Sequence, residues 1–246
     1  MRLVWKKNLT RALPLISGNE MRVSKVPLVL AALFLGGQPE AQQWVEYANL
    51  ADRFAVNFPK EPKIEEIIYL SEYRAMLPAR VYTAQRELSH YSVTVVDYTN
   101  TAQLLAERCD RTGERCRRDD LPGDILGSIA YAAWNIRQRG GEVTYDSWAH
   151  YDRIPGHQLQ ITNDDETRTF VGIFLHASRL YIAEATVPGE ALPPGLFQQS
   201  LRVLDGEGKV VRYEFYVDED GEVKKNRVDS RVQWSGNPPR ATRTSN

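Results

Sequence analysis

The chain has 246 residues, with 31 Lys and Arg against 32 Asp and Glu, and a formal net charge of −1. Residues 1–41 hold six of the basic residues and two of the acidic ones, which leaves the rest of the chain with a net charge of −5. A modestly acidic domain has no electrostatic attraction to nucleic acid or to an anionic membrane. The composition therefore argues against nucleic acid as a partner, and the length suits one domain with a sizeable core.

The segment that begins at Met21 has the layout of a secretory signal peptide. Arg22 and Lys25 precede ten uncharged residues, 26–35, and small residues follow up to Ala41. Ten apolar residues are too few to span a bilayer. A short buried helix or strand is the competing interpretation, and Met1 competes with Met21 as the true start. We expect a leader over residues 1–41, a periplasmic or secreted protein, and no membrane span in the remainder.

The first half of the remaining chain alternates apolar and polar residues, as half-buried antiparallel strands do. Residues 44–50 form a short entry segment, either helical or extended. Strands are expected over residues 53–58, 63–70, 79–86 and 91–98, the last two joined by a turn near Ser89. This half is therefore predicted to be an antiparallel meander.

After Asp124 the apolar residues recur at helical spacing until Gly140 and Gly141 end the run, which predicts a helix. Strands are expected again over residues 143–151, 156–162, 168–175 and 180–186. A second helix is predicted from Pro193 to Leu204, and a terminal hairpin over residues 210–217 and 222–228. The predicted single domain covers residues 42–230, and residues 231–246 are predicted to be a disordered tail.

This element order predicts an α+β fold, an antiparallel β-sheet with two packed helices. Three segments carry a resemblance to a known family: residues 52–62, an aromatic strand that ends in proline, residues 168–182, a hairpin, and the helix from 193 to 204. In their order these segments resemble small exported bacterial proteins of unknown function with the PsbP-like α/β sandwich, named for a photosystem extrinsic subunit. The resemblance implies a fold and an extracytoplasmic address. It implies no reaction.

The two cysteines, Cys109 and Cys116, are separated by six residues in a polar segment that contains Gly113. In an oxidising compartment such a pair predicts a disulfide that closes a short loop. Half of a zinc site is the alternative, but the sequence has no second cysteine pair and no histidine nearby. The leader has no cysteine, which argues against lipid attachment at the cleavage site.

The densest group of potential ligands lies between Asp146 and His157 and includes His150 and Asp152. Two imidazoles and two carboxylates could supply a metal-dependent enzyme, but a solvated strand face is the simpler explanation of them. No nucleophile elbow, phosphate-binding loop or dinucleotide motif is present. We therefore expect no catalytic residue, no metal site and no cofactor.

Four aromatic residues crowd the end of the main predicted helix and the strand after it: Trp134, Tyr145, Trp148 and Tyr151. They could form the core between helix and sheet, or line a surface where a ligand or partner binds. Trp148 and Tyr151 fall on opposite faces of the strand, so at least one of them should be partly exposed. The sequence favours an exported, non-catalytic binding module for an envelope protein or a small ligand. A metal-dependent enzyme that uses the cluster from Asp146 to His157 is the alternative.

Overall fold

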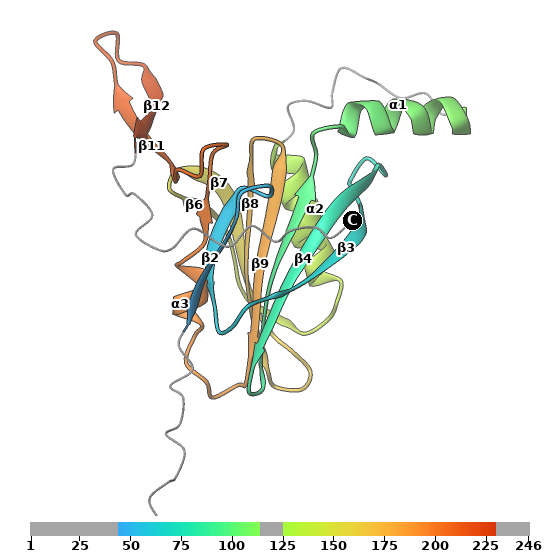
Figure 1. Ribbon diagram of the computed structural model, residues 1–246, viewed down its shortest axis with the longest axis vertical. Helices are drawn as coiled ribbons and strands as arrows, with labels where there is room; N and C mark the ends of the chain where they lie inside the picture. The colour runs from blue at the N-terminus through green and yellow to red at the C-terminus, as the bar shows by residue number, and fades with distance from the viewer. Residues whose placement is uncertain (1–43, 114–124, 230–246) are drawn as a thin grey trace, which may run out of the picture. The chain divides into compact units, whose positions relative to one another are not determined.

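The computed structural model describes residues 44–113 and 125–229. Its largest element is a seven-stranded antiparallel sheet in the order β3-β4-β5-β9-β8-β7-β6 (Figure 1). The strands of this sheet are β3 (Lys63–Leu70), β4 (Met76–Arg86), β5 (Ser89–Asp97), β6 (Glu142–Tyr151), β7 (Ile154–Thr162), β8 (Arg168–His176) and β9 (Arg179–Val187). Each neighbouring pair except β5 and β9 is joined by a hairpin, so the sheet consists of a three-stranded and a four-stranded meander.

Two smaller antiparallel sheets accompany the large one. The first consists of β1 (Val45–Asn49), β2 (Phe54–Phe58) and the two-residue β10 (Arg202–Val203). The second is the hairpin of β11 (Val211–Val217) and β12 (Val223–Asp229). Three helices are described: α1 (Thr101–Thr112), α2 (Ile125–Arg137) and α3 (Gly195–Gln198). Among the described residues, no helix is both long enough and apolar enough to cross a membrane.

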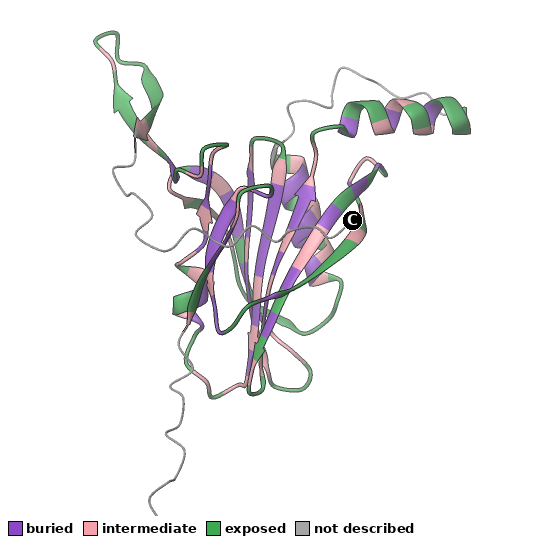
Figure 2. Cartoon of the chain, viewed as in Figure 1, coloured by how far each residue is buried: buried purple, intermediate pink, exposed green. Residues whose placement is uncertain are grey.

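The large sheet is buried on both faces, because successive side chains of a strand point to opposite sides. On one face, aromatic residues of β1 and β2 pack with α3 against side chains such as Tyr82 and Tyr181. On the other face, Ile129, Ala133 and Ile136 of α2 pack against aliphatic side chains of β7, β8 and β9. The buried residues therefore gather on the central strands (Figure 2), whereas the edge strands β3 and β6 are largely exposed.

The predicted α+β fold, an antiparallel sheet with two packed helices, is wrong in its share of helix. The described chain is mostly β-structure with three antiparallel sheets. The closing helix predicted from Pro193 to Leu204 is reduced to the four residues of α3. The chain then becomes extended, and Arg202 and Val203 pair with Ala55 and Phe54 of β2. A second sheet, rather than a second long helix, therefore covers one face of the large sheet.

Helix α1 was missed in the sequence, although its buried residues Thr101, Leu105 and Cys109 recur every four positions. Gly113, which the sequence marks as a turn, is its C-cap: its φ is 71°, and its N–H donates to Cys109 O. Left-handed backbone of this kind favours glycine. Cys109 is buried. Cys116 lies outside the described residues, so the predicted disulfide stays a prediction. The predicted leader and the predicted tail also lie outside them.

Candidate functional site

The predicted cluster between Asp146 and His157 is divided between two neighbouring strands. Trp148 of β6 lies opposite His157 of β7, and Asp146 lies opposite Leu159. Residues directly opposite each other share a face of the sheet. That face is the one α2 covers, since Leu159 belongs to the core cluster beneath the helix. Arg137, in the last turn of α2, donates from Nε to Asp146 Oδ2 at 2.7 Å.

His157 is enclosed by this arrangement, with only 5% of its surface exposed. Its Nε2 lies 2.5 Å from Asp146 Oδ1 and carries the hydrogen of the bond, because a carboxylate can only accept. Its Nδ1 is buried and has no hydrogen-bond partner among the described residues. The hydrogen bonds from Arg137 and, next, His157 hold the pKa of Asp146 below its ordinary value. The pair thus resembles a catalytic dyad in composition, but Nδ1 is buried and Nε2 is engaged by Asp146.

Two of the four predicted binding aromatics flank this network and are exposed. Trp148 contacts the His157 ring edge-on, with 5.0 Å between ring centroids, yet 52% of its surface remains exposed. Trp134 is 51% exposed and stacks on Tyr131 of the same helix. It precedes Arg137 by about one helical turn, and Trp148 follows Asp146 by two residues. We call Trp134 and Trp148 the aromatic surface.

The other two predicted residues, Tyr145 and Tyr151, lie on the opposite face of β6. Tyr145 is exposed, whereas Tyr151 packs partly buried against the core. The Tyr151 ring contacts Phe174, and its hydroxyl donates to Gln199 O at 3.1 Å. Tyr151 therefore serves to attach the segment after α3 to the sheet, and the four aromatic residues do not form one surface.

The histidines and carboxylates are also not brought together as a metal would require. Asp152 lies in the turn after β6 and pairs with Arg212 at 3.3 Å. His150 is exposed near the end of β6. Within the described parts of the chain, no group of three potential ligands is close enough to hold a metal ion.

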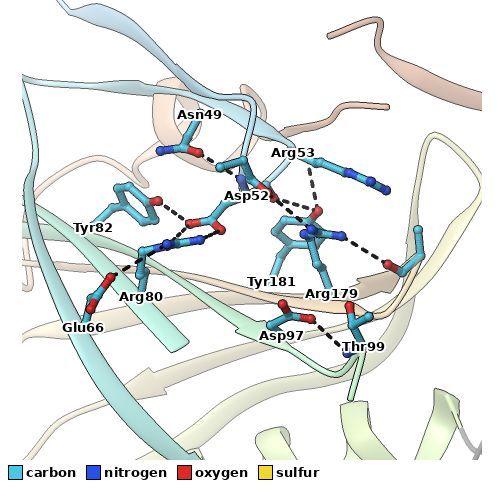
Figure 3. Close-up of polar contacts among 12 residues, drawn as sticks. Asn49, Asp52, Arg53, Glu66, Arg80, Tyr82, Asp97, Thr99, Arg179 and Tyr181 are labelled. Atoms are coloured by element: carbon cyan, nitrogen blue, oxygen red, sulfur yellow. Dashed lines mark hydrogen bonds and ion pairs between the residues drawn. The ribbon is translucent and has the colours of Figure 1, made fainter. Parts of the chain in front are cut away.

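A buried polar network that sequence reasoning missed surrounds Asp52 at the turn between β1 and β2 (Figure 3). Asp52 is 5% exposed. It accepts hydrogen bonds from the Arg80 guanidinium at both carboxylate oxygens, one of them from Nε at 2.7 Å, and from the Tyr82 hydroxyl. Burial and then the bond to Asp52 raise the pKa of Tyr82, so its hydroxyl remains a donor.

The backbone of the same turn is held as well. Tyr181 of β9 donates its hydroxyl to the carbonyl oxygens of Asp52 and Arg53, at 3.1 and 3.2 Å. Arg53 has a φ of 56°, an unfavourable value for a residue other than glycine, asparagine or aspartate. The network thus attaches the β1–β2 hairpin to the large sheet and fixes its turn. Beside it lies a hollow of about 410 Å³ that Asp97 and Ile68 help to line. A lone Asp before an alternating strand gives no sign of partners 28 residues or more away.

Comparisons with known proteins find a structural neighbour but no matching family. The sequence matches no family model and no curated protein. Among solved structures, the solution structure of cyanobacterial PsbP (CyanoP) from Synechocystis sp. PCC 6803 aligns with 69% of this chain and 98% of its own. The two are 12% identical, with a TM-score of 0.39. This neighbour is a PsbP protein, the kind that the sequence resembles, and at this TM-score it carries no conclusion about function.

Proposed function

We propose that the protein is an exported, non-catalytic binding module that contacts a protein of the cell envelope through its aromatic surface, Trp134 and Trp148. The observation that carries the proposal is Trp148, a large exposed aromatic residue that packs against the buried ring of His157, which Asp146 holds at Nε2. Tryptophan is enriched among the residues that dominate binding energy at protein interfaces. A side chain held in place loses less conformational entropy when a partner binds.

The non-catalytic part of the proposal is supported by the geometry of His157. A general base must reach the proton that it removes, directly or through one water molecule. Nε2 of His157 is engaged by Asp146, which Arg137 holds from its other oxygen. Nδ1 is buried. Nε2 engaged by Asp146 and a buried Nδ1 suit a group that supports the aromatic surface better than an acid–base group.

Export is supported by the leader predicted over residues 1–41. The predicted bond between Cys109 and Cys116 belongs to the same proposal, because disulfides persist in oxidising compartments. The net charge of −5 predicted for the chain after residue 41 gives no attraction to nucleic acid.

The test is recovery of the envelope partner with protein that has passed through the periplasm. Trp148→Ala should weaken binding about 30-fold, which corresponds to roughly 2 kcal/mol for an aromatic anchor. Leu88→Ala is the matched control, since Leu88 is an apolar side chain 75% exposed at the β4–β5 turn. His150→Ala should also leave recovery unchanged. Equal recovery with Trp148→Ala and Leu88→Ala would contradict the proposal, and a metal-dependent activity abolished by His150→Ala would favour the enzyme.

A further inference from the structure

The face of the large sheet that α2 covers changes from apolar to polar beyond the end of the helix. Ile182 of β9 belongs to the core under α2, and Glu184 is the next residue of β9 on that face. Ser92 lies opposite Glu184, Thr83 opposite Ser92, and Lys63 opposite Thr83. One row across four strands is therefore entirely polar.

The next row repeats the change. Thr186 follows Glu184 by two residues and so shares its face. His90 lies opposite Thr186, and Gln85 lies opposite His90. Two neighbouring rows thus bring hydroxyl, amide, imidazole and ammonium groups together on one side of β3, β4, β5 and β9. Their residues lie far apart in sequence, which is why no motif reveals them.

These two rows line a hollow of about 360 Å³. Lys60, from the segment between β2 and β3, adds a second ammonium group to its lining. A volume of this size is at the lower end of small-molecule sites and suits a ligand as large as a monosaccharide. The aromatic surface contributes no residue to this lining, so the hollow is a separate feature of the molecule.

The charge of the hollow is positive, although the chain as a whole is slightly acidic. Its only carboxylate among the lining residues, Glu184, is neutralised by Arg139, whose Nη1 donates to both oxygens at 3.0 and 2.7 Å. Lys60 and Lys63 form no ion pair with any residue between 44 and 113 or between 125 and 229. The lining therefore includes two lysines without such an ion pair, together with the hydroxyl-bearing residues Thr83 and Ser92.

We propose that this hollow binds a small molecule that carries an oxyanion, either a carboxylate or a phosphate monoester. Lysine binds such groups as a point charge, and hydrogen bonds to an ionised acceptor are about twice as strong as neutral ones. In this arrangement Lys60 and Lys63 supply the charge, and the hydroxyl groups of Thr83 and Ser92 supply neutral donors. The inference does not depend on the proposed protein partner.

Nuclear magnetic resonance titration of the ¹⁵N-labelled protein tests the site with three sugars of similar size. Glucose 6-phosphate carries the phosphate, glucuronate carries the carboxylate, and glucose carries neither. We expect saturating shifts of the amides of Ser92, Glu184 and Thr186 with at least one charged sugar and none with glucose. The charged sugar that binds shows whether the hollow takes a phosphate or a carboxylate.

Lys60→Gln combined with Lys63→Gln should weaken this binding at least tenfold. Both lysines are exposed, so the variant should fold, and the dispersion of its spectrum verifies this. Lys209→Gln combined with Lys224→Gln is a control of equal net charge, because these lysines pair with acids elsewhere, and it should bind as the wild type does. No saturable shift with either charged sugar, or shifts that are the same in both double variants, would overturn the inference.

Discussion

The ion pair of Asp52 and Arg80 should be the strongest single polar contribution to holding the β1–β2 hairpin on the large sheet. In Arg80→Met the methionine retains the apolar stem but removes the guanidinium that binds both oxygens of Asp52. Within residues 44–113 and 125–229, the buried carboxylate then keeps only the Tyr82 hydroxyl as a partner. Breaking one side of a buried ion pair costs about 3–5 kcal/mol. Because the Arg80 side chain is 39% exposed, water screens part of the interaction, and we expect a loss of about 2–3 kcal/mol.

A double variant separates the cost of an unpaired buried charge from the cost of the lost hydrogen bonds. Asp52→Asn combined with Arg80→Met removes the unpaired charge and still offers an oxygen to the Tyr82 hydroxyl. This double variant should be more stable than Arg80→Met alone by at least about 1 kcal/mol, since an uncompensated buried charge is the larger cost.

Urea unfolding followed by tryptophan fluorescence measures both free energies of unfolding. Arg212→Met is the control, because Arg212 is half-exposed and its Nε lies 3.3 Å from Asp152, and it should cost less than about 1 kcal/mol. An Arg80→Met protein within about 0.5 kcal/mol of the wild type would refute the reasoning, given the typical size of surface effects. So would a double variant no more stable than Arg80→Met.

Three further expectations concern acid, the cysteines and the leader. The pKa of Asp146 is lowered in the folded state, so ionised Asp146 stabilises the fold above about pH 4. This stabilisation is lost as the pH falls through the folded pKa. Between about pH 5 and pH 3 the urea midpoint should therefore fall less in Asp146→Asn than in the wild type. Cys109→Ser should lower the free energy of unfolding by about 2–3 kcal/mol and the melting temperature by roughly 4–12 °C. Two free thiols in unreduced periplasmic protein would exclude the disulfide. Mass spectrometry of the exported protein should find Gln42 or a neighbour as the first residue, whereas a product that begins at Met1 or Met21 would contradict export.

Alternation and helical spacing predicted the elements whose side chains face a single core. The strand predicted over residues 53–58 is β2, and the helix predicted after Asp124 is α2. Both have a strong period, because each buries one face against the large sheet.

Elements that depend on contacts distant in sequence were not predictable in this way. Leu201 and Leu204 fit a helical spacing, but pairing of Arg202 and Val203 with β2 draws the chain into a strand. Tertiary pairing thus outweighs a weak local preference. Helix α1 was overlooked because the cysteines and charges of residues 109–116 suggested a loop.

The candidate site was predicted only in part, for the same reason. Proximity of Asp146 and His157 depends on the hairpin register between β6 and β7, and Arg137 joins them from α2. The two-residue turn at Asp152 and Arg153 sets that register, whereas the predicted second strand began only at residue 156. The division of the four aromatic residues between two faces follows from strand alternation, which the sequence did indicate for Trp148 and Tyr151.

Site-specific photocrosslinking in the cell envelope tests the central claim most directly. A photoreactive phenylalanine analogue at position 148 replaces Trp148 by another aromatic side chain and reacts only with what lies within a few ångströms. The proposal predicts one dominant crosslinked protein from position 148 and none from the same analogue at position 88, where the exposed Leu88 lies. No crosslinked protein from position 148, or the same products from both positions, would contradict it.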